Sequence, residues 1–274
     1  MTALAEIVTS RELLANLTLR ELRSKYKRSA LGWAWSLVNP LVTMAVFTVV
    51  FSVFLKAKPD AGNPSGLDIF ALWLLTGLLP WNFLANSLTG GMSSLVGNAN
   101  LIKKVYFPRE LLVGSAVGAW LVTFMIEMGV LACVLLAFGN MVLPWIPLVL
   151  VVASLQTVFV LGLALGFAVM NVYFRDVEHF LAIGLQVWFY ATPVVYPMKY
   201  VHSLAKYHAL GVSALDLYRA NPMTQFAIAY RNIFYDLRFP SAETWGYLVG
   251  WTAFAILAGW ALFSAREGGL AEEL

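Results

Sequence analysis

The sequence predicts an all-α membrane protein with six transmembrane helices. Hydrophobic residues make up 60% of the 274 residues and charged residues only 12%, whereas a soluble domain carries about 25% charged residues. No charged residue occurs from residue 29 to residue 55, or from residue 128 to residue 174. The first run exceeds the roughly 20 residues that cross a bilayer core, and the second is long enough for two such helices. We therefore expect residues 1–274 to form a single transmembrane domain.

Residues 1–32 are predicted to form an interfacial arm on the cytoplasmic face. Thr18 and Glu21 have the spacing of a capping box, which favours a helix start at Thr18. Leu19 and Leu22 begin an apolar stripe at helical spacing, and cations fill much of the remaining helix surface. Such an amphipathic helix lies in the headgroup layer, and its positive charge places it on the cytoplasmic side. The cations are Arg20, Arg23, Lys25, Lys27 and Arg28.

Six apolar segments are predicted to cross the bilayer, in a bundle that covers residues 35–265. They are residues 35–55, 69–93, 111–138, 145–170, 180–198 and 244–265. An even number of spans places both termini in the cytoplasm, including a short tail at residues 266–274. With this topology, 11 of the 18 Lys and Arg residues lie on the cytoplasmic side, in agreement with the positive-inside rule.

Residues 199–243, between the fifth and sixth spans, are amphipathic rather than apolar. Asn221 and Pro222 are typical of a helix start, with an N-cap residue followed by proline in the first turn. We expect short helices here that enter the outer leaflet without crossing it, because half-inserted elements are tolerated where they are buried in protein or line a cavity. Five cations in this segment argue against an outer position. A cytoplasmic position with an odd number of spans remains the alternative.

The sequence holds few residues that could catalyse a reaction or bind a cofactor. It lacks a GxxxxGK phosphate loop, an HExxH motif and a CxxC motif. Its three histidines are scattered, and the single cysteine, Cys133, can form no intrachain disulfide. The net charge of +3 is small and gives no reason to expect a nucleic-acid partner. We therefore expect no catalytic residue, no metal and no cofactor in this chain.

Glu127 is the only charged residue deep inside a predicted span. A charge at a helix centre costs about 2.5 to 3.5 kcal/mol on insertion scales, so this carboxyl should face protein or be protonated. A structural role in the interior and a role in lining or proton relay both remain open.

The loop at residues 98–110 is the strongest candidate for a working part. Apolar side chains alternate with cations there, although a loop that only turns in water needs no such side chains. This composition suits docking into a groove on a cytoplasmic partner, and a helix on the lipid surface is the alternative. The candidate residues are Leu101, Ile102, Lys103, Lys104, Val105, Tyr106, Phe107, Pro108 and Arg109.

Aromatic residues are abundant, with 10 Trp, 11 Tyr and 18 Phe. Many fit the interfacial belts of a membrane protein or ordinary core packing. Aromatic faces also stack on sugar rings, so a conduit for glycans is a second interpretation. The candidate lining residues are Phe47, Phe51, Phe54, Trp81, Phe83, Trp188, Tyr190 and Tyr196.

Five motifs, in this order along the chain, resemble the permease subunits of ATP-binding-cassette exporters of polysaccharides and polyol-phosphate polymers. These exporters move O-antigen, teichoic acid or cell-wall galactan. The motifs are RELRSKYKRSALGWAWSLVNPL at residues 20–41, LIKKVYFPREL at 101–111, YFRDVEHF at 173–180, TPVVYP at 192–197, and NPMT at 221–224 with YR at 230–231. Each motif alone is weak evidence for this family, whereas the five motifs together in this order are specific evidence for it.

The resemblance implies a permease in the bacterial inner membrane that pairs with a second copy of itself. Two separate ATPase subunits would bind ATP and magnesium and contact residues 98–110, the coupling helix. Residues 199–243 would form re-entrant gate helices at the outer mouth, including Asn221, Pro222, Tyr230 and Arg231. The cargo would be a glycan on a polyprenyl-diphosphate lipid. ATP would close the partner subunits, the docked loop would move, and the spans would part to let the glycan pass.

The basic arm could attract the diphosphate head of that cargo through Arg20, Arg23, Lys25 and Arg28, and anchoring to anionic membrane lipids is the alternative. The composition, which is rich in Ala, Val and Leu, favours cell-wall galactan as the exported polymer. Two other functions remain open. One is a membrane-embedded enzyme acting on polyprenyl-linked sugars, and the other is a small-molecule exporter of the same superfamily.

Overall fold

The computed structural model describes residues 11–25, 32–54, 61–105, 107–197, 208–209 and 212–274. Their regular structure is almost entirely helical. The α-helices are α2 (Arg11–Lys25), α3 (Trp35–Phe47), α4 (Phe70–Gly97), α5 (Ala99–Lys104), α6 (Glu110–Ala137), α7 (Ile146–Tyr173), α8 (Val177–Tyr190), α10 (Ala214–Ala220), α11 (Pro222–Tyr230), α12 (Ala242–Arg266) and α13 (Leu270–Glu273).

Shorter elements complete the chain between these helices. Turns of 3-10 helix are η1 (Gly32–Ala34), η3 (Leu143–Trp145) and η5 (Glu267–Gly269), and π-helical segments are η2 (Thr48–Phe54) and η4 (Arg231–Asp236). A small antiparallel hairpin, absent from the sequence prediction, pairs β1 (His208–Ala209) with β2 (Val212–Ser213).

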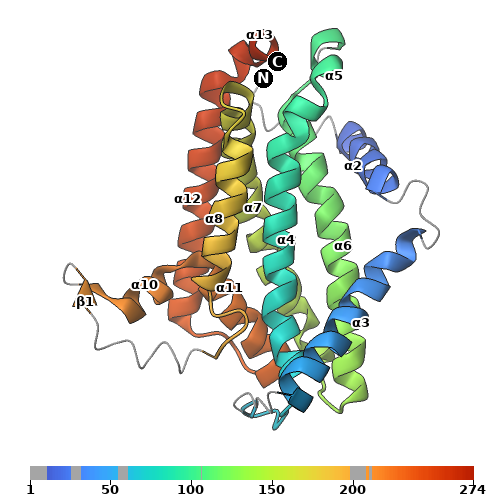
Figure 1. Ribbon diagram of the computed structural model, residues 1–274, viewed down its shortest axis with the longest axis vertical. Coiled ribbons are helices and arrows are strands. Elements are labelled where there is room, and N and C mark those ends of the chain that lie inside the picture. Colours follow the sequence, from blue (N-terminus) through green and yellow to red (C-terminus); the bar gives the residue numbers. More distant parts are fainter. Residues whose placement is uncertain (1–10, 26–31, 55–60, 106, 198–207, 210–211) are drawn as a thin grey trace.

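The long helices α4, α6, α7, α8 and α12 run along the long axis of the molecule, with α4 at the centre (Figure 1). Helix α4 packs against both α6 and α7, and 20 of its 28 residues are buried. A mostly apolar helix is typical either of a protein core or of a membrane span, and the burial of α4 places it in the core. The bundle is therefore built around α4.

Among the described residues, three helical stretches are long and apolar enough to cross a membrane: Glu110–Ala137, Leu143–Tyr173 and Ala242–Glu273. They cover the spans predicted at residues 111–138, 145–170 and 244–265. Helix α4 covers the predicted second span, and α3 with η2 covers most of the first, where Leu41–Val50 is a shorter apolar helix. The structure agrees with the prediction of an all-α protein with several membrane-spanning helices.

The fifth predicted span is longer than the helix that the structure contains. Helix α8 ends at Tyr190, eight residues before the predicted end at residue 198. A turn with Pro193 follows, and proline disfavours helix both at its own position and at the one before it. At 1.5 Å per residue, the 14 residues of α8 cover about 21 Å, less than the roughly 30 Å of a bilayer core.

The N-terminal helix starts earlier than the capping-box spacing predicts. Helix α2 begins at Arg11, so Thr18 lies inside it rather than at its N-cap. The Thr18 hydroxyl donates a hydrogen bond to the Leu14 carbonyl, at 2.8 Å. The capping-box prediction is therefore wrong, because tertiary packing extends the helix through a sequence that could also have started one.

The buried face of α2 also differs from the predicted stripe. Leu17 and Leu22 are 6% and 3% exposed, whereas Leu19 is 43% exposed. The buried face packs on α6, where Gly114 and Gly118 leave room for side chains of α2. Small residues at such positions allow two helices to approach closely. Much of the apolar face of α2 is thus covered by α6 rather than by lipid.

Glycines also set the contact between α7 and α12. A side chain at Gly259 would collide with the Gly162 carbonyl of α7, and one at Gly162 would collide with the backbone at Ala255. The two helices can therefore pack backbone against backbone here. Thr252 adds a hydrogen bond to the Leu155 carbonyl, at 3.3 Å.

A buried polar chain joins α11 to the centre of the bundle. The Tyr230 hydroxyl donates to Gln156 Oε1 at 3.0 Å, and Gln156 Nε2 donates to the Pro80 carbonyl at 2.8 Å. Both side chains are fully buried. Satisfied polar groups in a low-dielectric core specify one arrangement. These two hydrogen bonds therefore fix α11 against α7 and α4.

The described part of residues 199–243 lies at one end of the bundle, opposite α5 and α13 (Figure 1). It comprises the hairpin, α10, α11 and η4, and residues 198–207 and 210–211 are outside the described residues. Loop contacts tie η4 to this end. The Tyr235 hydroxyl donates to the Leu67 carbonyl at 2.7 Å, and Asn140 Nδ2 donates to the Phe234 carbonyl at 2.6 Å.

Candidate functional site

A polar pocket of about 510 Å³ opens between α2, α4 and α6. Small side chains of α4 and α6 leave the space, and α2 supplies charged groups to it. The pocket lies along the part of α4 that leads into α5. It is lined by Arg20, Glu21, Ser24 and Lys25 of α2, by Gly90, Ser93, Ser94, Gly97 and Asn98, and by Ala116, Ala119 and Trp120 of α6.

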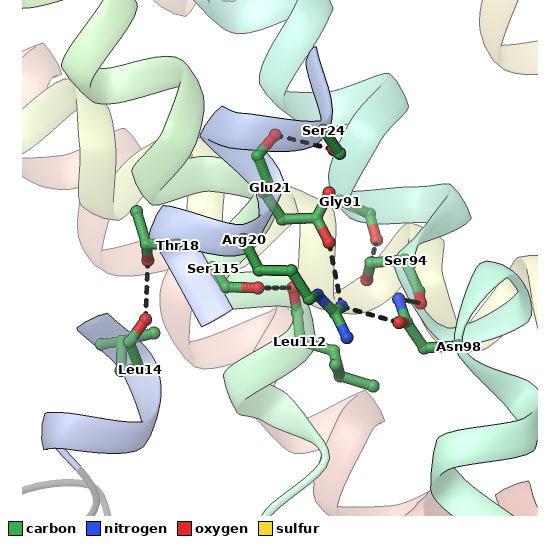
Figure 2. Close-up of polar contacts among 10 residues, drawn as sticks. All are labelled: Leu14, Thr18, Arg20, Glu21, Ser24, Gly91, Ser94, Asn98, Leu112 and Ser115. Carbon is green, nitrogen blue, oxygen red and sulfur yellow. Dashed lines mark hydrogen bonds and ion pairs between the residues drawn. The ribbon is translucent and has the colours of Figure 1, made fainter. Parts of the chain in front are cut away.

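Arg20 extends from α2 toward the end of α4 (Figure 2). Its Nη2 atom donates to Asn98 Oδ1 at 2.7 Å and pairs with Glu21 Oε1 at 3.0 Å. Asn98 Nδ2 donates in turn to the Ser94 carbonyl at 2.8 Å, which turns the Asn98 oxygen toward the guanidinium. An exposed ion pair such as Arg20–Glu21 contributes only about 0–1 kcal/mol. The Arg20 guanidinium is therefore held in a defined orientation, while its ion pair with Glu21 is weak.

Lys25 reaches from α2 to the middle of α6. Its ammonium donates to Thr123 Oγ1 at 3.1 Å and lies 3.2 Å from the centroid of the Trp120 ring, a cation–π arrangement. Partial removal from water lowers the pKa of Lys25 to about 8, and the Glu127 carboxylate opposes that shift. The ammonium is still mostly protonated at neutral pH and is held at a defined position in the pocket.

The structure brings together only two of the four predicted head-group residues. Arg20 and Lys25 both line the pocket. Arg23 is exposed on α2 and is not among the lining residues. Arg28 is outside the described residues.

Glu127 lies half-buried in α6 next to a recess of about 10 Å³. The recess is apolar, with side chains from α3, α4 and α6 around it. Its other lining residues are Leu41, Met44, Leu75, Leu79, Val130, Leu131 and Val134. The carboxyl thus faces protein, as predicted, and its charge interacts with that of Lys25.

The predicted docking loop forms the short helix α5 and a bend that leads into α6. Lys103, Lys104 and Val105 are exposed, and Val105 retains 51% of its accessible surface. Ile102 is buried, whereas Leu101 and Phe107 pack against the core. Tyr106 is outside the described residues. Among the described residues of this segment, the exposed side chains are thus Asn100 and a small patch of two cations and one apolar residue, Lys103, Lys104 and Val105.

Pro108 and Arg109, near the end of that loop, turn inward. Pro108 is half-buried, and its carbonyl accepts the Leu111 N–H at 3.2 Å. Arg109 Nη1 donates to the Glu267 carbonyl in η5. Arg109 is therefore engaged by the C-terminal segment of the same chain.

At the opposite end, Asn221 holds three segments together. Its Oδ1 atom caps α11 by accepting the Met223 N–H at 3.0 Å, and it also accepts the Trp188 Nε1–H at 2.9 Å. Its Nδ2 atom donates to the Ala191 carbonyl at 3.1 Å. Pro222 is the first residue of α11, so the predicted helix start is confirmed.

Arg231 joins η4 to the turn that follows α8. Its two terminal nitrogens donate to the carbonyls of Pro193 and Val194, both at 2.7 Å, and its guanidinium carbon lies 3.7 Å from the Trp73 ring centroid. The residue is only 8% exposed. The motifs TPVVYP, NPMT and YR, far apart in sequence, thus form one structural unit that we call the outer clamp: Trp188, residues 191–194, Asn221 and Arg231.

The predicted lining aromatics occupy different environments. Trp81 is buried and makes an edge contact with Trp188, with ring centroids 5.8 Å apart. Phe83 is buried and stacks on Phe124 at 4.8 Å. Phe47 packs at the edge of the core.

The other lining candidates lie nearer the surface. Tyr190 and Phe54 are 62% and 75% exposed. Tyr196 donates to the Tyr190 carbonyl at 2.7 Å. The side chain of Phe51 is outside the described part of the structure.

Comparison with known proteins assigns the architecture. The family model for the ABC-2 type transporter matches residues 12–235. This chain belongs to the ABC-2 type transporter family. It is 32% identical over 273 residues to an O-antigen export system permease protein of Myxococcus xanthus, and the match covers 98% of each chain.

Two further relatives are similar over most of their length. An O-antigen export system permease protein of Klebsiella pneumoniae is 28% identical over 224 residues, which are 81% of this chain and 80% of the relative. A polysialic acid transport protein of Escherichia coli is 21% identical over 261 residues, or 92% of each chain.

Membership of the ABC-2 family makes the chain a multi-pass permease subunit of the inner membrane, and such permeases work with ATPase subunits. The family match includes α2, α4, α5, α6 and the outer clamp. Helix α12 and the C-terminal segment that holds Arg109 lie beyond it.

Sequence reasoning missed the pocket as a unit. It singled out the cations of α2, but not Trp120, Asn98 or the small residues that make room between the helices. One signal was available: the segment SLTGGMSSLVGN, residues 87–98, is rich in Gly and Ser inside a predicted span. Small residues of this kind mark a close approach or a space beside a helix.

Proposed function

We propose that this ABC-2 permease exports a polysaccharide carried on a polyprenyl-diphosphate lipid from the cytoplasmic to the outer side of the inner membrane. Cargo of the O-antigen class is supported by the full-length similarity to an O-antigen export system permease protein. Cell-wall galactan is a narrower possibility that only the composition favours.

The observation that carries the proposal is the exposed patch of Lys103, Lys104 and Val105 on α5 and the residue after it. Helix α5 extends from the end of the bundle (Figure 1), and Arg109 ties the following bend to the C-terminal segment. A short helix that is exposed on one side and braced on the other can transmit a push. We therefore assign residues 98–110 to the contact with a partner ATPase subunit, which binds ATP and magnesium.

The proposed topology has six spans with both termini in the cytoplasm. The three long apolar stretches, together with α4, α3–η2 and α8, supply the six crossings. We assign α5 to the ATPase contact, and α13 lies at the same end of the bundle as α5 (Figure 1), so this topology places that end in the cytoplasm. The outer clamp and residues 199–243 then lie at the outer face, as a gate that includes Asn221, Pro222, Tyr230 and Arg231.

We also propose that the permease works with a second copy of itself and two ATPase subunits. Helix α8 is too short to cross the bilayer core unaided, and four of its side chains form an exposed apolar stripe at helical spacing. They are Phe180, Ile183, Val187 and Tyr190, each 62–72% exposed. The second copy would cover this stripe, and Phe54 and Tyr190 would lie near the cargo path between the copies.

The dimer is testable by cross-linking in membranes. We expect Ile183→Cys, made in a Cys133→Ser background, to form a disulfide-linked dimer on mild oxidation. Phe254→Cys, an exposed position on α12, is the matched control and should stay monomeric. Equal cross-linking at both positions would contradict the proposed interface.

Deletion of the gene tests the function itself. If the chain exports a lipid-linked glycan, the deletion strain accumulates that glycan on the cytoplasmic side of the inner membrane and loses it from the cell surface. Complementation with the wild-type chain restores both. A surface glycan that is unchanged in the deletion strain would reject polysaccharide export.

A further inference from the structure

The proposed function leaves open where the phosphate-bearing head of the cargo first contacts the permease. Four of the cations on the N-terminal arm are the head-group candidates, and a charged arm alone would attract any anionic lipid. The structure separates these cations. Arg20 and Lys25 line the pocket between α2, α4 and α6, whereas Arg23 is exposed outside it.

The lining of this pocket is chemically unusual for a helix bundle. Between the charged helix α2 and the mostly apolar helices α4 and α6, it gathers two cations, the Glu21 carboxylate, the amide of Asn98 and the hydroxyls of Ser24, Ser93 and Ser94. These groups can donate to, or attract, phosphate oxygens. Its volume of about 510 Å³ falls within the roughly 300–1,000 Å³ of small-ligand sites.

The two cations approach the pocket from fixed directions. Asn98 holds the Arg20 guanidinium at 2.7 Å, and Trp120 and Thr123 hold the Lys25 ammonium at 3.2 and 3.1 Å. The lining residues carry two cations, Arg20 and Lys25, and one carboxylate, Glu21, so an incoming dianion meets a net positive lining. Arg20 also has the exposed pair with Glu21, which a phosphate could displace at little cost.

The position of the pocket suits a lipid head that enters from the cytoplasmic side. Its α4 residues run from Gly90 to Gly97, and Asn98 follows directly before α5. Eight residues of helix correspond to about 12 Å of depth. A head group here would therefore lie within about 12 Å of the end of α4, beside the segment assigned to the ATPase contact.

We propose that the pocket between α2, α4 and α6 binds the diphosphate ester head of the lipid cargo, with Arg20 and Lys25 contacting phosphate oxygens and Asn98 and Trp120 positioning them. This inference rests on the proposed function, since it assigns that function's cargo to one site. A phospholipid phosphate has related chemistry, and the experiment below separates the two.

The test measures binding of farnesyl diphosphate to the full chain in detergent, by native mass spectrometry. We expect Arg20→Gln combined with Lys25→Gln to weaken binding at least tenfold. Arg23→Gln, which removes a cation from the same helix outside the pocket, should change it less than twofold. Farnesol and phosphatidylglycerol should bind at least tenfold more weakly than farnesyl diphosphate, and inorganic diphosphate should compete for the site.

A second variant fills the pocket without removing charge. Gly97 lines the pocket, and a Cβ atom there meets nothing within 4 Å, so Gly97→Leu should fold normally and weaken binding at least tenfold. Gly129→Leu, also in open space on α6, is the matched control and should bind normally.

Three results would overturn the inference: equal losses for Arg23→Gln and for the double variant of Arg20 and Lys25, unchanged binding in Gly97→Leu, or phosphatidylglycerol binding as tightly as farnesyl diphosphate at the same residues. None of these would reject export itself, which the deletion strain reports. Conversely, tight binding in a protein whose deletion leaves the surface glycan unchanged would reject the export function while keeping the site.

Discussion

At the scale of single residues, Arg231 joins η4 to the turn that follows α8. It satisfies the carbonyls of Pro193 and Val194 and lies over Trp73. In a chain turn that ends a helix, such carbonyls have no partner within the helix. The guanidinium fits this task because its planar fork reaches two acceptors at once, which a lysine ammonium cannot reproduce.

Replacing Arg231 should therefore destabilise the outer clamp. We expect Arg231→Gln to cost about 1–3 kcal/mol, the penalty for buried polar groups left without partners, and Arg231→Lys to recover only part of it. Thermal unfolding in detergent measures the loss. Arg238→Gln is the control, because Arg238 is exposed in the same segment and its removal should change stability by less than about 0.5 kcal/mol. Equal shifts for both arginines would contradict the clamp.

At the scale of elements, the contact of α7 with α12 depends on two glycines. A methyl group at Gly259 would collide with the Gly162 carbonyl, whereas Gly250 on the same helix has open space around it. We expect Gly259→Ala to destabilise the chain by about 1–3 kcal/mol or more through overpacking. Gly250→Ala should be neutral or slightly stabilising, since alanine favours helix over glycine. The yield and unfolding temperature of the purified variants distinguish these outcomes, and a stable Gly259→Ala protein would reject the close approach.

The C-terminal segment is a second element with a specific role. Leu270 of α13 is fully buried, α13 contacts both α5 and α7, and Arg109 donates to Glu267. We expect Leu270→Ala to loosen this contact by about 2–5 kcal/mol, so that amide hydrogens of residues 99–109 exchange faster. Glu272→Gln, an exposed change in the same helix, should leave exchange unaltered. Unchanged exchange in Leu270→Ala would mean that the tail does not brace α5.

At the scale of the whole molecule, composition and charge-free runs predicted the helical bundle and several of its spans well. Uniform apolar runs such as those of α6 and α7 leave little choice of structure. The fifth span was overestimated because its sequence stays apolar beyond Tyr190, where a proline-containing turn ends the helix. The start of α2 was wrong because Thr18 and Glu21 satisfy a local rule that packing on α6 overrides.

The candidate site was only half predictable for a similar reason. The cations of α2 are visible as a charge cluster, and the segment around α5 as an unusual mixture of charge and apolar residues. The pocket, in contrast, is assembled from segments near residues 20, 95 and 120. No spacing within one of these segments reveals that the other two lie beside it.

The central claim is that another subunit's ATP hydrolysis drives this permease through the exposed patch on α5. The most direct test reconstitutes the chain with its partner ATPase in vesicles and measures glycan exported per ATP hydrolysed. Val105 is 51% exposed, so Val105→Asp should change stability by no more than about 0.5 kcal/mol. The account predicts that this variant exports less than a tenth of the wild-type glycan per ATP, whereas Leu217→Asp, an exposed change at the opposite end, exports normally. Wild-type export per ATP in Val105→Asp would contradict the account.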